Sequence, residues 1–168
     1  KETTEIKWDA EAAEKAGFEH FMMKEIYEQP KAIRDTLNSV VKDGVIDFTD
    51  IDITEEEIKK YSQIYIVACG SAWHVGVEAQ YVIEELAQIP VRVELASEFR
   101  YREMPLVKDG LVIVISQSGE TADTLAAMRM AKDKGLATLA VVNVIGSSIA
   151  READKVFYTL AGPEICVA

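Results

Sequence analysis

The feature that most constrains the fold of this chain is a series of short apolar runs, rich in β-branched residues, that starts at residue 64. The runs lie at residues 64–68, 91–95, 111–115, 137–142 and 156–160. Runs of this length and composition are typical of buried strands, whereas helices need longer segments. Most of the runs show no alternation of apolar and polar residues, so we expect a sheet that is covered on both faces.

Helical patterns separate these runs. Between the first two runs, five apolar residues fall on one helical face: Val75, Ala79, Val82, Ile83 and Leu86. Between the third and fourth, a second helical pattern covers residues 121–134 and ends at Gly135. Strands that alternate with helices predict a parallel sheet with helices on both faces. We therefore expect an α/β fold of the doubly wound, flavodoxin-like type with about five strands.

The length of 168 residues suits a single domain. Residues 1–17 are mostly polar and charged, so we expect them to form a linker arm that leads into a domain covering residues 18–168. No internal repeat or low-complexity segment interrupts this domain.

Three helices are expected ahead of the sheet. The first two run from Phe18 to Pro30 and from Pro30 to Gly44, because proline is favoured in the first turn of a helix and glycine at its end. Thr54, followed three residues later by Glu57, matches a capping box and predicts a short third helix.

Composition excludes several classes of function. The chain has 29 Asp and Glu against 18 Lys and Arg, a formal net charge of -11, and no basic cluster, which disfavours nucleic acid and anionic membranes as partners. It shows neither a signal-peptide pattern nor an apolar stretch long enough for a membrane helix, so we expect a cytoplasmic protein.

The metal-binding and redox-active side chains are few. Cys69 and Cys166 lack CxxC spacing, and His20 and His74 are the only histidines, so we expect no metal site and no cofactor. Both cysteines are expected to be reduced and buried, because free cysteine packs as a small apolar residue.

Ligands of open parallel α/β sheets bind beyond the carboxyl ends of the strands, which directs attention to the loops at 69–72 and 116–121. The second loop, Ser-Gln-Ser-Gly-Glu-Thr, places three hydroxyls and an amide around Gly119 with no positive charge. Hydroxyls and a helix N-terminus suit a phosphate, and Gly119 permits a positive φ. Two interpretations remain open, an anion site and ordinary helix capping by Ser118 or Thr121.

Other patterns weigh less. Neither GxxxxGK[ST] nor GxGxxG occurs in the two loops, which disfavours a nucleotide cofactor. The turn-forming residues at 143–148 are interpreted as a cap for the segment that follows. Trp73 is interpreted as a core or interface residue, and Glu120 as a solvated or capping carboxylate. His74 has no evident partner in the sequence.

On these residues the chain resembles the glutamine:fructose-6-phosphate aminotransferases, also called glucosamine-6-phosphate synthases. The resemblance rests on the serine-rich loop, on the segment ASEFRYR at 96–102, on HFMMKEIYEQP at 20–30 and on residues 143–154. The loop alone is typical of any sugar-isomerase (SIS) domain, and the other segments narrow the likeness to the aminotransferases. The resemblance covers nearly the whole chain and implies the first of two SIS halves that follow a glutaminase domain.

The resemblance implies that the complete protein converts fructose 6-phosphate and glutamine-derived ammonia to glucosamine 6-phosphate. It assigns sugar-phosphate binding to Ser71, Ala72, Ser116, Gln117, Ser118, Thr121 and Val167. It also implies a homodimer and no cofactor. In this family the first loop usually reads Cys-Gly-Thr-Ser, so Ala72 has lost a hydroxyl here. The family's catalytic glutamate, histidine and lysine belong to later segments, so no catalytic residue is expected in this chain, and the fragment alone is expected to be inactive.

Two other classes stay open from the sequence. One is a sugar-phosphate-sensing SIS module of a regulator or of another amino-sugar enzyme, which an upstream basic helix-turn-helix would favour. The other is a flavin-binding doubly wound domain, since one fold serves many functions.

Overall fold

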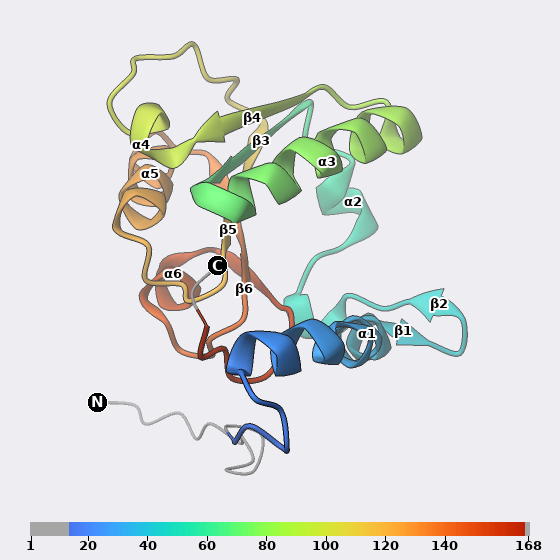
Figure 1. Cartoon of the computed structure of the whole chain (residues 1–168). Helices are drawn as coiled ribbons and strands as arrows, with labels where there is room; N and C mark the ends of the chain where they lie inside the picture. Colours follow the sequence, from blue (N-terminus) through green and yellow to red (C-terminus); the bar gives the residue numbers. More distant parts are fainter. Residues whose placement is uncertain (1–13, 167–168) are drawn as a thin grey trace. The chain divides into compact units, whose positions relative to one another are not determined.

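The computed structural model describes residues 14–166, so most of the expected linker arm lies outside the described residues. The chain divides into two compact units (Figure 1). One comprises Lys1–Asp47 together with Tyr158–Ala168, and the other comprises Phe48–Phe157. The second unit contains the sheet, apart from its last residue, Tyr158, and both candidate loops.

The sheet has five strands: β3 (Gln63–Ala68), β4 (Val91–Leu95), β5 (Gly110–Ser116), β6 (Ala137–Val142) and β7 (Lys155–Tyr158). Their order is β4-β3-β5-β6-β7, and β3 pairs in parallel with both β4 and β5, as β5 does with β6. Counted from β3, this is the 2-1-3-4-5 order of flavodoxin-like folds. The expected doubly wound α/β sheet is confirmed, and the predicted strands agree with the observed ones to within two residues at either end.

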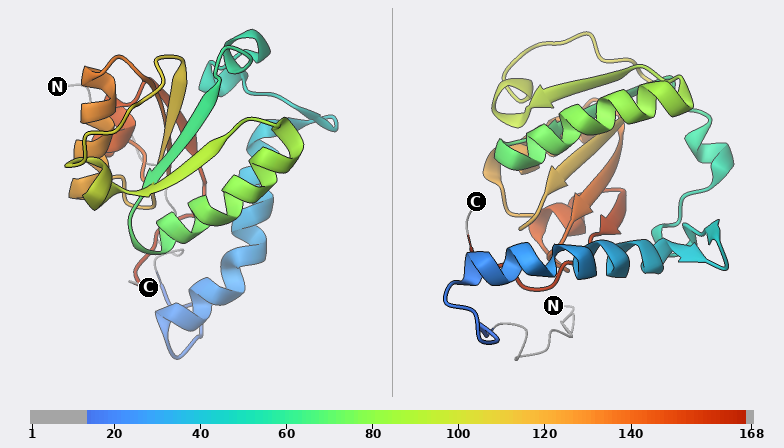
Figure 2. Two further views of the ribbon diagram at one scale, coloured as in Figure 1. Left: turned by 90° about the horizontal axis from the view of Figure 1, so that it is seen from above. Right: turned by 45° about the vertical axis from the view of Figure 1, so that its right-hand side comes forward.

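Helices cover both faces of the sheet (Figure 2). On one face α3 (Gly70–Ala87) packs on β3 and β4, while on the other α5 (Ala122–Asp133) packs on β5 and β6, beside α4 (Ala96–Phe99) and α6 (Ser148–Glu152). Alternate residues of each strand face opposite layers. Ile66 and Val91 therefore pack toward Ala79 and Ile83 of α3. The fully buried Val112 and Val114 belong to the opposite face.

Only part of the apolar face predicted for α3 meets the sheet, because Ala79 and Ile83 pack on it whereas Val82 and Leu86 do not. Val82 and Leu86 are 55% and 79% exposed, whereas the buried residue of the helix is Gly76. A Cβ at Gly76 would lie 2.8 Å from the side chain of Ile66. The absence of a side chain at Gly76 lets α3 approach β3 closely, and this contact rotates the predicted apolar stripe partly into solvent.

The first unit differs from the prediction at two points. A single helix, α1 (Phe21–Val40), runs through Pro30, which was expected to begin a new helix. Proline removes one backbone donor but is compatible with helical φ, so it does not end the helix here. The helix ends at Val40, and Gly44 belongs to a hairpin of β1 (Val41–Lys42) and β2 (Val45–Ile46). Asp43 and Gly44 have φ of 53° and 78°, the backbone that an Asp-Gly hairpin turn requires.

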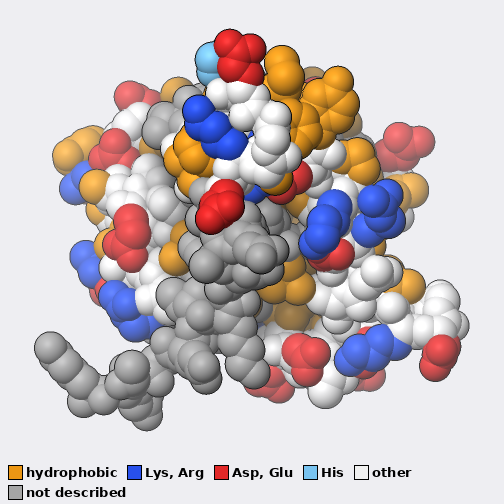
Figure 3. All heavy atoms as spheres, turned by 60° about the horizontal axis from the view of Figure 1, so that its bottom comes forward, with side chains coloured by type: hydrophobic (Ala, Val, Ile, Leu, Met, Phe, Trp, Pro, Cys, Tyr) orange, Lys and Arg blue, Asp and Glu red, His pale blue; other side chains and the backbone are white. Residues whose placement is uncertain are grey.

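Several large apolar side chains of α1 are exposed. Ile26, Tyr27 and Ile33 are more than half exposed. A space-filling view of one face shows hydrophobic side chains interspersed with charged ones (Figure 3). Within residues 14–166, no helix is both long enough and apolar enough to cross a membrane.

The short segment before the sheet contains η2 (Thr49–Ile51) and α2 (Glu55–Ile58). The Thr54 hydroxyl accepts a hydrogen bond from the Glu57 N–H at 3.1 Å, which confirms the Thr54 half of the predicted capping box, although the helix is shorter than expected. Lys155, at the start of β7, forms an ion pair with Asp52 at 2.8 Å and so ties this segment to the sheet.

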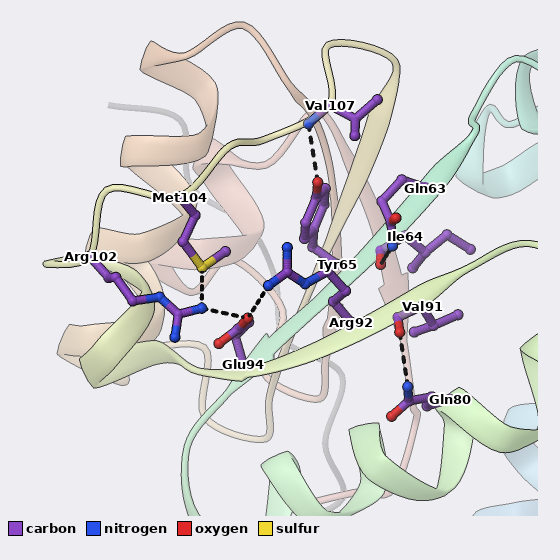
Figure 4. A network of polar contacts seen from close by, with 10 residues as sticks. All are labelled: Gln63, Ile64, Tyr65, Gln80, Val91, Arg92, Glu94, Arg102, Met104 and Val107. Carbon is purple, nitrogen blue, oxygen red and sulfur yellow. Dashed lines mark hydrogen bonds and ion pairs between the residues drawn. The ribbon is translucent and has the colours of Figure 1, made fainter.

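The segment between α4 and β5 contacts two neighbouring strands, β3 and the edge strand β4 (Figure 4). The buried Tyr65 hydroxyl accepts from the Val107 N–H at 3.1 Å. On the edge strand β4, Glu94 lies between Arg92 and Arg102, with N–O distances of 3.6 and 2.9 Å. Charged side chains on this edge strand disfavour pairing with a further strand.

Candidate functional site

Both candidate loops leave the sheet at its topological switch point. Ala68 of β3 is the register partner of Ile115 of β5, so Cys69 and Ser116 start neighbouring loops. The loop after β3 leads into α3 on one face, and the loop after β5 leads into α5 on the other. Doubly wound folds bind ligands where two adjacent strands diverge in this way. The topology thus brings together the two loops that the sequence singles out.

Ser116 organises the serine-rich loop from within. Its side chain is buried, and its Oγ accepts from the Gly119 N–H at 3.0 Å and lies 3.0 Å from the Thr121 Oγ1. These contacts close the loop into a compact turn. The Ser116 side chain therefore serves to hold the loop in this shape.

The remaining polar groups of the loop are more accessible. The Ser118 Oγ accepts from the Glu120 N–H at 3.2 Å, which leaves its own proton for another acceptor. Gln117 is exposed, while its carbonyl accepts from the N–H groups of Asn143 and Val144. Thr121 is the N-cap residue of α5, yet its side chain makes no capping hydrogen bond. The capping interpretation therefore lacks its expected contact, and the α5 N-terminus lies beside the loop hydroxyls.

Gly119 is required by its surroundings. Its φ is +65°, and a Cβ there would lie 2.0 Å from the Ser147 Oγ and 2.5 Å from the Ser147 Cβ. The Gly119 carbonyl accepts from the Ile149 N–H at 3.0 Å. The loop is thus held directly against the segment that leads from β6 into α6.

The loop at 69–72 brings fewer polar groups to the candidate site than the serine-rich loop does. Cys69 is the N-cap residue of α3, and its Sγ accepts from the buried Thr124 Oγ1 at 3.8 Å, which links the first loop to the first turn of α5. Ser71 is exposed and Ala72 is partly buried. The expected burial of both cysteines is wrong: Cys69 and Cys166 are free thiols of intermediate exposure.

Trp73 and His74 form an edge-to-face pair with ring centroids 4.9 Å apart. The Trp73 indole N–H is buried and, within residues 14–166, makes no hydrogen bond. His74 is exposed.

The segment at 96–102 meets the first turn of α5. The Arg100 guanidinium lies 2.7 Å from the Asp123 carboxylate. Asp123 would otherwise place an unpaired negative charge near the helix N-terminus and oppose an anion there. No sequence pattern links these two residues, which lie 23 positions apart.

Two further predicted features have different outcomes. Val167 lies outside the described residues. The segment at 143–148, interpreted as a simple cap, contacts the serine-rich loop at several points.

Among residues 14–166, no three His, Cys, Asp or Glu side chains lie close enough together to hold a metal ion.

The fold and the loops define the class of protein. The family model of the SIS domain matches residues 57–168, and the chain belongs to this family. The resemblance drawn from the serine-rich loop is therefore confirmed.

Comparison with individual relatives narrows the resemblance to one group of proteins that contain SIS domains. The chain is 61% identical over its full length to the glutamine–fructose-6-phosphate aminotransferase (isomerizing) of Clostridium acetobutylicum, and 59% identical to that of Caldanaerobacter subterraneus. It spans 28% of each of those proteins.

The solved structures agree. The C-terminal domain of the glucosamine-fructose-6-phosphate aminotransferase from Francisella tularensis superposes with a TM-score of 0.87 at 44% identity, over 90% of this chain and 43% of that one. The sugar isomerase domain of an RpiR transcription factor from Sphaerobacter thermophilus shares only the fold, at 22% identity and a TM-score of 0.63.

Proposed function

We propose that this chain is the sugar-phosphate-binding first SIS half of a glutamine:fructose-6-phosphate aminotransferase, with residues 18–168 as the domain and residues 1–17 as a linker arm. The observation that carries the proposal is the serine-rich loop at the switch point, in which hydroxyls and the α5 N-terminus converge without a competing unpaired charge. The close similarity to aminotransferases supports the choice of fructose 6-phosphate and glucosamine 6-phosphate as ligands.

Within this site, Gln117, Ser118 and Thr121 would contact the phosphate, and Ser116 would hold the loop in shape while sharing its hydroxyl. Ser71, Ala72 and Val167 would lie toward the sugar. The carboxylate of the serine-rich loop, Glu120, is already engaged with α6, so we assign the chain to binding and not to proton transfer. In this proposal the complete protein makes glucosamine 6-phosphate, and this fragment alone is inactive.

The proposal extends to assembly and location. Exposed apolar residues of α3, such as Leu86, support a homodimer or another covering surface. The two free thiols are compatible with the cytoplasm.

Calorimetric titration with fructose 6-phosphate tests the proposal. We expect saturable binding that inorganic phosphate competes away and that Ser118→Ala weakens by at least about threefold, the loss of one hydrogen bond. Ser62→Ala is the matched control, because Ser62 is exposed and precedes β3 at the opposite edge of the sheet. Equal affinity in Ser118→Ala and Ser62→Ala, or no binding by the unaltered chain at millimolar ligand, would contradict the proposal.

A further inference from the structure

The serine-rich loop does not hold its shape alone, because it is hydrogen-bonded to the segment joining β6 to α6 and to the first residues of α6. Four backbone or side-chain contacts connect them. The Gln117 carbonyl accepts from two N–H groups of that segment, the Gly119 carbonyl accepts from Ile149, and the Glu120 carboxylate accepts from Ser148. Of these groups, only the Glu120 carboxylate is a side chain and can be altered by substitution without moving the backbone.

The N-terminus of α6 is capped in an unusual way. Ser147 is its N-cap residue and is a favoured type for that role, yet its side chain makes no capping hydrogen bond. Its hydroxyl is buried against Gly119 and, within the described residues, has no partner. The Glu120 Oε1 instead accepts from the Ser148 N–H at 2.7 Å. The cap of α6 is therefore supplied from the serine-rich loop.

Glu120 is tied to the loop as well as to α6. Its own N–H donates to the Ser118 Oγ at 3.2 Å, which fixes the orientation of that hydroxyl. The hydrogen bond from Ser148 lowers the pKa of Glu120 below its ordinary value, so the carboxylate stays charged and its contact with the N–H is charge-assisted.

We propose that Glu120 is a positioning residue that supplies the cap of α6 and thereby holds the serine-rich loop, with the Ser118 hydroxyl and Gly119, in its anion-binding shape. This inference rests on the proposed function for the identity of the ligand. The contacts that carry it belong to the ligand-free chain, so the two proposals can fail separately.

The experiment compares four chains: the unaltered one, Glu120→Ala, Glu120→Gln and Ser147→Ala. Glutamine keeps an oxygen that can accept from Ser148, whereas alanine removes it. Ser147→Ala removes the hydroxyl of the residue that would cap α6 in an ordinary helix. Glu152→Ala serves as a control for general loss of packing, because Glu152 pairs with Arg129 of α5 at 2.5 Å, away from the loop.

Amide hydrogen exchange of the ligand-free chains is the first measurement. We expect Glu120→Ala to raise the exchange rates of the Ser148 and Gly119 N–H groups by about fivefold, the usual effect of losing a cap. Glu120→Gln and Ser147→Ala should leave both rates within about twofold, and Glu152→Ala should leave Gly119 unchanged. If Ser147→Ala raises the Ser148 rate as much as Glu120→Ala does, or if Glu120→Ala leaves Gly119 unchanged, the proposal is wrong.

Titration of the same chains with fructose 6-phosphate is the second measurement. The affinity should fall in Glu120→Ala and be restored in Glu120→Gln, although glutamine removes the charge. Equal losses in Glu120→Ala and Glu152→Ala would indicate general destabilisation and would overturn the positioning role. If the unaltered chain does not bind the sugar phosphate, the proposed function fails, and the exchange rates still decide the role of Glu120.

Discussion

Replacing Gly119 with alanine separates two physical effects at the centre of the candidate site. Gly119 has a left-handed backbone, and the space beside its Cα is filled by Ser147. A left-handed conformation costs a non-glycine residue about 1–2 kcal/mol. Forcing a methyl group into a filled space costs about 1–3 kcal/mol more. We therefore expect Gly119→Ala to lower the free energy of unfolding by about 2–5 kcal/mol, a large part of the roughly 5–15 kcal/mol available to a typical domain.

Gly135 provides the matched control. Its φ is +81°, and a Cβ there would have no neighbour within 4 Å. Gly135→Ala should therefore cost only the backbone part, about 1–2 kcal/mol. Urea unfolding followed by circular dichroism measures both variants, and the difference between them isolates the contact with Ser147.

A second substitution checks the assignment of that difference. Ser147→Gly removes both atoms that the new methyl group would strike, so it should restore most of the steric loss in the Gly119→Ala background but not the backbone loss. Ser147→Ala removes only the hydroxyl and should restore less. Equal losses in Gly119→Ala and Gly135→Ala, or no rescue by Ser147→Gly, would refute the close packing of the loop on the β6–α6 segment.

Two more predictions concern ligand affinity and pH. Ala72→Ser restores the hydroxyl that the resembling family carries and should tighten fructose 6-phosphate binding about two- to tenfold by calorimetry, with Ala87→Ser at the far end of α3 as the unaffected control. Although desolvation raises the pKa of Asp154, hydrogen bonds from Lys132 and Thr138 outweigh it and leave that pKa lowered. The charged form therefore stabilises the fold above about pH 4, and this contribution is lost as the pH falls through the lowered pKa. Asp154→Asn should be less stable than the unaltered chain at pH 7, and urea unfolding should show that gap narrowing at acidic pH; a gap that does not change with pH would contradict the assignment.

The sheet could be predicted from the sequence because its strands are short, continuous apolar runs that leave little ambiguity. The doubly wound, flavodoxin-like type of fold followed from the alternation of strands with helices and from the chain's resemblance to a known family. The two loops could be located for the same reason, since parallel strands direct their carboxyl ends to one edge. The pattern of apolar residues alone was sufficient to predict the strands that are buried on both faces.

Pattern failed where a tertiary contact decided between local alternatives. Of the five apolar residues that share a face of α3, Ala79 and Ile83 pack on the sheet, but the buried residue of the helix is Gly76, which contributes nothing to an amphipathic pattern. In the same way, Pro30 lies inside α1 because a long helix tolerates the loss of one backbone donor. The Asp43-Gly44 turn carried a recognisable hairpin pattern, which was interpreted as the end of a helix.

The polar contacts of the site were the least predictable part. A sequence shows that Ser147 can cap a helix, but not that its hydroxyl is turned toward Gly119 while Glu120 takes its place. Likewise, nothing in the segment at 96–102 indicates that Arg100 pairs with Asp123. Such pairings depend on distances between segments that only the folded chain brings together.

These two pairings also show how the proposed phosphate site could form in an acidic protein without a lysine or arginine in the loop. Glu120 and Asp123 flank the start of α5, and either carboxylate would repel a phosphate if left unpaired. Glu120 is directed to the positive end of α6 and Asp123 to Arg100, so each negative charge is offset locally. A phosphate beside Ser118 would then meet hydroxyl donors and the positive end of the α5 dipole, and these act at hydrogen-bond distance. The net charge of -11 is spread over the whole chain and is screened beyond about 8 Å at physiological ionic strength. The local arrangement of charges, and not the net charge, therefore decides whether the site attracts an anion.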